Sequence, residues 1–311
     1  MKERIRKKKG LKSSTSLSLQ LTILALPGIL YYLIFCYLPM GGLVLAFKQY
    51  RYDLGIIKSP FIGFENFKFF FATNLWKTVT GNTILYAAAS LITNVICSVF
   101  VAMLLMEVRR KTAIKFYQTS MYLPNFMSWV LVSFIVYLFL NHDAGILNQI
   151  IRHFGGEGIK WYNDPNYWPY ILVFTNLWKS IGMNCLIYYA ALLGVDREEY
   201  EAAEIDGAGK LKQMLYISVP HLVPLVSIMS ILAVGNFFRG DFGLFYNVPR
   251  NMGVLYPATD VIDTFIYRGL MKNGDIGMTT AVGLFQSVMG LILVLITNTI
   301  ANKIEPDNAL F

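Results

Sequence analysis

The stretch that decides the fold is residues 80–106, TGNTILYAAASLITNVICSVFVAMLLM, which runs for 27 positions without a charged side chain. A helix that crosses about 30 Å of hydrocarbon needs about 20 apolar residues, because each residue adds about 1.5 Å. A barrel strand would need only about 10 residues of alternating polarity, and this stretch does not alternate. The segment is therefore predicted to be a membrane-spanning helix.

Five other segments have the same character. Together with the first they give six predicted spans, at residues 19–47, 80–106, 119–140, 169–193, 221–238 and 279–301. Hydrophobic residues make up 55% of the 311 positions and charged residues only 15%, whereas soluble proteins carry about 25% charged residues. This composition excludes a disordered chain and a secreted disulfide scaffold. The predicted fold class is all-α, a polytopic membrane bundle of six transmembrane helices over residues 19–301.

Basic residues concentrate in the loops on one predicted side of the membrane. With the N-terminus inside, 15 Lys and Arg fall among 67 inside positions, against 11 among 100 outside positions. Because basic loops stay on the cytoplasmic side, both termini are predicted to be cytoplasmic. They form a basic tail over residues 1–18, which membrane lipid would attract, and a short tail over residues 302–311. The net charge of +8 needs no nucleic acid, since no soluble module interleaves basic and aromatic residues.

The inside loop at residues 196–220 has the features of a short helix–turn–helix. Asp196 is predicted to cap a helix over residues 197–205, which are good helix formers. Gly207 and Gly209 supply the left-handed conformation that ends many helices. An amphipathic stretch follows, and the proline that closes the loop is predicted to stop this stretch and to begin the fifth span.

Three short motifs in this loop keep a fixed spacing, namely Glu201-Ala202-Ala203, Gly207 and Ile217-Ser218-Val219-Pro220. They resemble the EAA loop in the membrane subunits of ABC importers, with Val219 where that family usually has Leu. Further matches are Trp178-Lys179 with Gly182, Gly240-Asp241-Phe242-Gly243 and residues 259–268. The resemblance covers nearly the whole chain. It implies the fold of a type I ABC importer permease and points to the branch of the family that carries complex oligosaccharides.

The resemblance implies that the loop docks into a groove of a separate ATP-hydrolysing subunit and transmits its closure to the membrane. The implied coupling residues are Glu201, Ala202, Ala203, Asp206, Gly207, Ala208, Ile217 and Pro220. The small side chains permit close approach of a partner, and the carboxylates can pair with basic groups. The chain has no G-x-x-x-x-G-K-[ST] phosphate loop of its own. The other implied partners are a second permease subunit, an extracellular solute-binding protein and a sugar substrate.

Polar side chains recur every four residues on two predicted spans, at Asn176, Ser180, Asn184 and Tyr188 and at Asn82, Tyr86, Ser90 and Asn94. These stripes either line a hydrated sugar pathway or form hydrogen bonds between helices. Lys179 lies near the bilayer centre, where a lysine is costly unless it meets water or a partner. The candidate pathway residues are Asn176, Trp178, Lys179, Ser180, Asn184, Tyr188, Asn236 and Gln286.

Other functions have little support in the sequence, and no catalytic residue, cofactor or metal site is predicted. The three histidines, His142, His153 and His221, lack metal-ligand spacing and a neighbouring nucleophile motif. An ion channel would need a filter motif or a ring of like charges. A membrane enzyme and an ABC permease for an amino acid or peptide stay open as alternatives to a sugar permease of the cell membrane. In the loop before the fourth span, clustered aromatic residues predict an interfacial belt, at Trp161, Tyr162, Tyr167, Trp168 and Tyr170.

Overall fold

The computed structural model describes residues 2–304, with the side chains of residues 17–300, 302 and 303. Over that range the chain is almost wholly helical, and the β pairing consists of an isolated bridge between Lys48 and Phe61. The all-α part of the predicted fold class is therefore confirmed. The predicted C-terminal tail lies mostly outside the described residues, and so do most side chains of the basic N-terminal tail.

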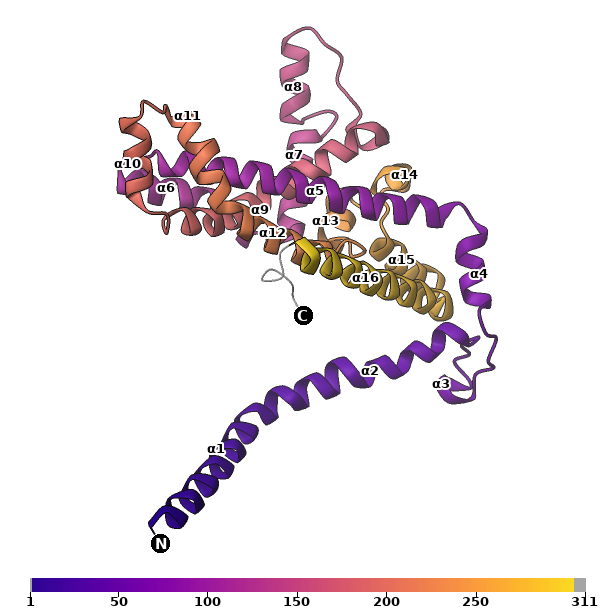
Figure 1. Ribbon diagram of the computed structural model, residues 1–311. Coiled ribbons are helices and arrows are strands. Elements are labelled where there is room, and N and C mark those ends of the chain that lie inside the picture. The colour runs from indigo at the N-terminus through magenta and orange to yellow at the C-terminus, as the bar shows by residue number, and fades with distance from the viewer. Residues whose placement is uncertain (1, 305–311) are drawn as a thin grey trace.

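Five long helices are joined by shorter ones (Figure 1). The long helices are α1 (Lys2–Tyr32), α5 (Leu75–Met106), α9 (Trp168–Leu192), α12 (Val219–Val234) and α16 (Ile276–Ile304). The first half of the chain adds α2 (Leu38–Met40), α3 (Gly55–Lys58), α4 (Glu65–Ala72), α6 (Lys111–Tyr122), α7 (Trp129–Leu140) and α8 (Ile146–His153). The second half adds α10 (Arg197–Ile205), α11 (Lys210–Gln213), α13 (Phe242–Asn247), α14 (Tyr256–Thr259) and α15 (Ile262–Asn273).

Within the described residues, four helices are long and apolar enough to cross a membrane. They are Leu17–Phe47, Leu75–Met106, Lys210–Val234 and Ile276–Ile300, and a bent pair of helices makes a fifth candidate. Helix α9 has the length, at 25 residues, but its amides and its lysine make it less apolar. The count of six spans stays a prediction.

The third predicted span is wrong as a single continuous helix. Helix α6 leads into a 3-10 turn at Leu123–Phe126, and α7 leaves that turn at an angle of 104°. Pro124 lacks an N–H and disfavours continuation of the α-helix. Two residues after the turn, the Ser128 hydroxyl accepts a hydrogen bond from the backbone N–H of Leu131 at 3.3 Å. That side chain caps a new helix, so one helix ends at this turn and the next begins directly after it.

The N-terminal helix extends away from the rest of the molecule (Figure 1). None of the apolar window in Leu17–Phe47 is buried against other parts of the chain. Helix α1 begins at Lys2, so the predicted boundary between a basic tail and the first span does not interrupt the helix. The apolar side chains of this helix therefore face surroundings other than the chain's own bundle.

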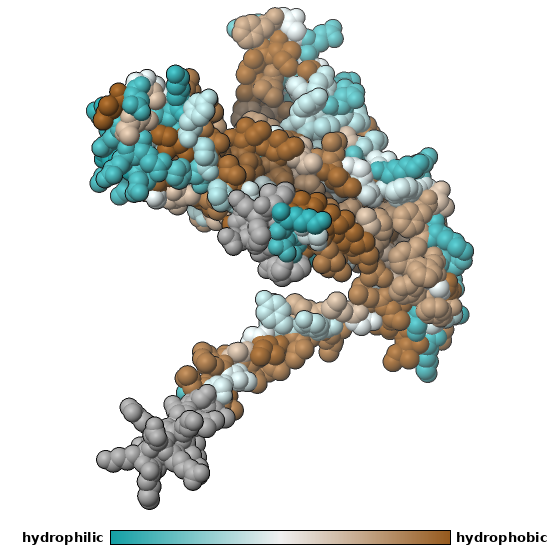
Figure 2. Space-filling view, in the orientation of Figure 1, coloured by the Kyte–Doolittle hydropathy of each residue, from teal (hydrophilic) through white to brown (hydrophobic). Residues whose placement is uncertain are grey.

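The centre of the fold is the pair α5 and α9, which contact each other more extensively than any other two described elements. One apolar cluster packs around the start of α9, where Trp168 is fully buried, and another around its end, where Leu192 is fully buried. Tyr162 is also buried, so the predicted interfacial belt is wrong for these two aromatic rings. Hydrophilic residues gather over α10 and α11 at one end, and hydrophobic residues cover the middle (Figure 2).

Candidate translocation pathway and coupling loop

A polar cluster lies between the two apolar clusters of the α5–α9 pair. Its centre is Asn94 of α5, whose amide donates a hydrogen bond to the Asn176 side-chain oxygen at 3.1 Å. The Asn94 oxygen accepts from the Ser180 hydroxyl at 2.6 Å and from the Asn184 amide at 3.2 Å. Three side chains spaced along one face of α9 therefore meet one amide of α5. The predicted stripe on α9 faces protein as expected.

The same face opens onto a cavity of about 390 Å³. Five of the eight predicted pathway residues line it, namely Asn176, Ser180, Asn184, Tyr188 and Asn236. Helices α5, α9, α12 and α13 supply the walls. The two interpretations of the stripe are thus compatible, because the same amides hold the helices together and border the cavity.

The cavity also has residues that the sequence analysis did not select as pathway candidates. Tyr86, Ser90 and Asn94 come from the second polar stripe, whose four-residue period already marked them. Arg239 and Asp241 come from the turn after α12, which no periodic pattern could place beside α5. Asp241 accepts a hydrogen bond from the Leu244 N–H at 3.2 Å and so caps α13.

Lys179 does not line this cavity, so its role as a pathway residue stays a prediction. Its ammonium group donates hydrogen bonds to the backbone oxygens of Asn125 at 2.9 Å, Met127 at 2.8 Å and Pro124 at 3.3 Å. It also lies 5.2 Å from the centre of the Trp129 ring. A helix end leaves carbonyl oxygens without intrahelical partners. Lys179 satisfies those oxygens where the broken span turns.

Trp178 and Gln286 also lie outside the cavity lining, so their roles as pathway residues stay predictions too. Trp178 packs against the apolar cluster at the start of α9. The Gln286 amide donates to the Phe238 backbone oxygen at 2.5 Å and to a carboxylate oxygen of Asp263 at 3.1 Å. These two bonds join α16 to Phe238, which follows α12, and to Asp263 of α15. Burial raises the pKa of the Asp263 carboxyl, while hydrogen bonds from Gly240 and Gln286 act against the rise.

In the loop at residues 196–220, α10 ends at Ile205, and the left-handed residue predicted to end it is Gly207. This glycine has a φ of +77°, a left-handed conformation that costs other residues about 1–2 kcal/mol. Its N–H donates to the Glu204 oxygen at 3.1 Å, and the Ala208 N–H donates to the Ala203 oxygen at 2.8 Å. The two bonds form a Schellman motif, which satisfies the last carbonyls of the helix.

Three details of the loop differ from the prediction. Helix α10 begins directly after Asp196, but the Asp196 side chain makes no capping hydrogen bond. Gly209 has a φ of −67° and precedes α11, so it is not a left-handed helix end. Pro220 does not stop the helix, which runs from α11 through a π-helical turn at Met214–Ser218 into α12. The wider turn changes the backbone pairing ahead of a residue that has no N–H.

The coupling candidates form an exposed surface. Glu201, Ala202, Asp206, Gly207 and Pro220 are exposed, whereas Ala203, Ala208 and Ile217 are half-buried. The carboxylate of Glu201 pairs with Arg197 one turn earlier at 3.1 Å. The Tyr200 and Ser218 hydroxyls are 2.9 Å apart, and this contact holds α10 against the π-helical turn.

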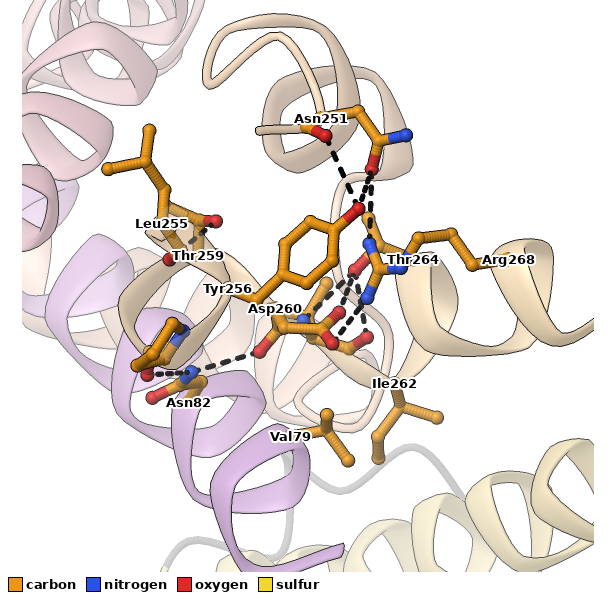
Figure 3. Close-up of polar contacts among 12 residues, drawn as sticks. Val79, Asn82, Asn251, Leu255, Tyr256, Thr259, Asp260, Ile262, Thr264 and Arg268 are labelled. Atoms are coloured by element: carbon orange, nitrogen blue, oxygen red, sulfur yellow. Dashed lines mark hydrogen bonds and ion pairs between the residues drawn. The ribbon is translucent and has the colours of Figure 1, made fainter. Parts of the chain in front are cut away.

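Residues 259–268 form a buried polar cluster at the far end of α5 (Figure 3). Arg268 forms an ion pair with Asp260, and both side chains are nearly buried. The Thr264 hydroxyl donates to the Asp260 carboxylate at 2.6 Å, and Asn82 of α5 donates to the Asp260 backbone oxygen at 3.0 Å. Burial raises the pKa of the Asp260 carboxyl, opposed by the Thr264 hydrogen bond and by Arg268. This cluster fixes α14 and α15 against α5.

Comparison with known proteins identifies the family. Residues 94–307 match the model of the binding-protein-dependent transport system inner membrane component. The chain belongs to this family. The match includes the polar face of α9, the coupling-loop candidate and residues 259–268 of the buried cluster in Figure 3.

The permease is similar to two proteins of Bacillus subtilis and to two solved transporter structures. It is 36% identical to Protein LplB of Bacillus subtilis (strain 168) over 92% of this chain and 90% of that protein. It is 35% identical to the polygalacturonan/rhamnogalacturonan transport system permease protein YteP of the same strain, over 91% and 88% of the two chains. Among solved structures it matches a bacterial ABC transporter that imports the acidic polysaccharide alginate, with a TM-score of 0.86, 29% identity, and 95% and 99% coverage. A second structure of an alginate transporter, solved with a pentasaccharide-bound periplasmic protein, matches with a TM-score of 0.84 and 29% identity, over 94% and 97% of the chains.

These similarities make the permease a multi-pass membrane component of a transport system, in a family of permeases and not of enzymes. No group of three metal-ligating side chains occurs in the part of the chain that the structure describes.

Proposed function

We propose that the permease forms half of the translocation pathway of an ATP-driven importer for a sugar or oligosaccharide. It would lie in the cell membrane with six spans and both termini in the cytoplasm, the arrangement that the distribution of basic loop residues favours. A second permease subunit would supply the other half, and an extracellular binding protein would deliver the substrate. The names of the similar proteins, which include transporters of polygalacturonan/rhamnogalacturonan and of alginate, support a carbohydrate.

The observation that carries the substrate proposal is the amide and hydroxyl surface of the cavity between α5 and α9. Asn94, Asn176, Ser180 and Asn184 offer both donors and acceptors there without a formal charge. A neutral hydroxylated ring needs mixed donors and acceptors of this kind. Water also wets such a surface, so the substrate would exchange one set of hydrogen bonds for another with little change in free energy.

A second candidate substrate is an amino acid or peptide, because Arg239 and Asp241 of the cavity lining carry opposite charges that could meet a zwitterion. The Asp241 carboxylate, however, already caps α13. Competition between a labelled trisaccharide and triglycine for uptake would separate the two candidates. Inhibition by triglycine at concentrations near those of the sugar would favour the peptide.

For coupling, we propose that α10 docks into a separate ATPase subunit through Glu201, Ala202, Ala203, Asp206 and the turn at Gly207. Ile217 and Pro220 would then belong to the helix that receives the movement. The exposure of α10 and its contact with the π-helical turn support this arrangement.

The coupling test compares two glycines that lie two positions apart. A Cβ at Gly207 or at Gly209 meets no atom within 4 Å, but only Gly207 has a positive φ. We expect Gly207→Val to strain the turn by about 1–2 kcal/mol and to reduce sugar-stimulated ATP hydrolysis severely. The matched Gly209→Val should retain stimulation. The measurement uses the assembled transporter with its binding protein, and size-exclusion chromatography confirms assembly. Equal stimulation in both variants would refute the coupling role of this turn.

A further inference from the structure

A second cavity lies away from the pathway, in the loop between α7 and α9. It encloses about 310 Å³, close to the lower limit of about 300 Å³ for ligand sites. Its lining comes from the end of α7, from residues 141–143, from residues 160–163 and from Met252. These segments lie on the side of the membrane that the loop charges predict to be outside.

One buried amide holds the two loop segments of this cavity together. Asn148 has no exposed surface, and its amide donates to the backbone oxygens of His142 at 3.0 Å and Ile159 at 2.8 Å. Its oxygen accepts from the Ile159 N–H at 2.9 Å and the Trp161 indole at 3.1 Å. A buried amide with these partners fixes the distance between the walls. The walls of the cavity are therefore held at a fixed distance by the fold of the loop.

Three exposed polar side chains of the cavity lining have no hydrogen-bond partner in the described part of the chain. Among the described residues, the side chains of Asp143, Lys160 and Asn163 make no hydrogen bond or ion pair, and all three residues are exposed. Asp143 and Lys160 carry opposite charges without forming a pair. Together the three offer carboxylate acceptors, ammonium donors and an amide that can both donate and accept hydrogen bonds. Trp161, Tyr162 and Tyr137 supply apolar surface beside them.

The wall that carries Met252 follows a strained turn. Arg250 and Asn251 have φ values of +56° and +49°, which residues other than glycine seldom adopt. The Arg250 guanidinium lies 4.2 Å from the centre of the Tyr137 ring. The Asn251 side-chain oxygen accepts from the Tyr256 hydroxyl at 3.0 Å, within the cluster of Figure 3. Such strain persists where the surroundings fix it, and it gathers at binding sites.

We propose that this cavity is an outer subsite that binds one ring of an oligosaccharide before the chain enters the membrane pathway. The proposal rests on the proposed sugar transport and on the loop being outside. Free donors and acceptors around an apolar surface match the hydroxyls and the ring face of a sugar. The small volume limits the site to a single ring, and the rigid frame lowers the ordering cost of binding.

The test measures sugar binding without the binding protein. The transporter is assembled from this permease, its partner permease and the ATPase in lipid nanodiscs, and labelled maltotriose and trigalacturonate are added in equilibrium dialysis. We expect a saturable site for at least one of them. The double variant Asp143→Asn with Lys160→Gln should weaken that site about 10-fold or more. The matched control is Glu157→Gln with Lys272→Gln, which neutralises one exposed acid and one exposed base outside the cavity and should bind like the wild type.

Two results would overturn the subsite, namely no saturable binding of either trisaccharide to the wild type, or equal affinity in the double variant and the wild type. Size-exclusion chromatography shows that each variant assembles. The proposed transport function has its own readout, which is uptake driven by the binding protein and ATP. Sugar uptake without a saturable outer site would contradict only the proposal of the subsite. Absence of sugar uptake by the wild-type transporter would contradict the proposed function.

Discussion

Helix α9 has two polar faces that differ in what they contact. Asn176, Ser180 and Asn184 face α5 and border the cavity, whereas Lys179 faces the break between α6 and α7. All four residues occur in one span within nine positions. The lysine near the predicted bilayer centre thus bonds to backbone oxygens at the helix break, whereas the amides border the cavity. Polarity within a span locates a site only when the partners of each side chain are known.

Gly182 lies about one turn after Lys179 in α9 and also faces the break between α6 and α7. A Cβ placed there would lie 2.1 Å from the backbone oxygen of Met121. Glycine therefore allows the end of α6 to approach α9 closely, and Lys179 then reaches the carbonyls of the following turn. Lys179 and Gly182 together fix the broken helix against α9, whereas the amides of α9 border the cavity.

The largest expected effect follows from removal of the Lys179 ammonium. Lys179→Met keeps the apolar stem but leaves the Asn125 and Met127 oxygens without their donor. Loss of these charge-assisted bonds should cost on the order of 3 kcal/mol. We expect a lower thermal unfolding midpoint and less assembled protein in detergent. Lys272→Met, at an exposed lysine, is the control. If Lys179→Met assembles and unfolds like the wild type but loses uptake, Lys179 belongs to the pathway after all.

A smaller effect is expected on the amide face. Asn94→Leu removes hydrogen bonds to Asn176, Ser180 and Asn184, and each bond between membrane helices contributes about 0.6 kcal/mol. The loss should therefore be about 2 kcal/mol, with uptake reduced more than the yield of assembled protein. Thermal unfolding and initial uptake rates measure the two effects. A variant that loses stability but transports normally would make this cluster a packing device only.

The smallest structural effect is expected at the rim of the cavity. Asn236 follows α12 and is exposed, and its side chain donates one long hydrogen bond of 3.4 Å to the Leu232 oxygen in the last turn of that helix. Asn236→Ala should change the free energy of unfolding by less than about 0.5 kcal/mol. It should raise the half-saturating substrate concentration for uptake by a few fold with little change in maximal rate. Unchanged half-saturation would place Asn236 outside the route of the substrate.

Local pattern predicted much of the fold. The apolar runs located α5, α9 and α16 to within about five residues at each end, because burial in lipid imposes length and polarity on each helix separately. The turn at Gly207 was predictable for the same reason, since a left-handed helix end depends on nearby residues. The break at residues 123–128 also has local causes, in a proline and a capping serine, but the long apolar run around them concealed it.

Contacts between distant segments were not predictable from one sequence. Arg239 reaches the cavity and Asn82 of α5 reaches the Asp260 backbone oxygen only because the segments after α12 return to α5. The sequence by itself determined that the chain is a helical membrane protein with a small-residue loop that resembles the EAA loop, since composition, period and motif spacing are properties of neighbouring residues. The tertiary structure alone decided which polar side chains border a cavity and which close a broken helix. A hydrogen bond depends on where its partner lies, and here the partners are up to 179 positions apart.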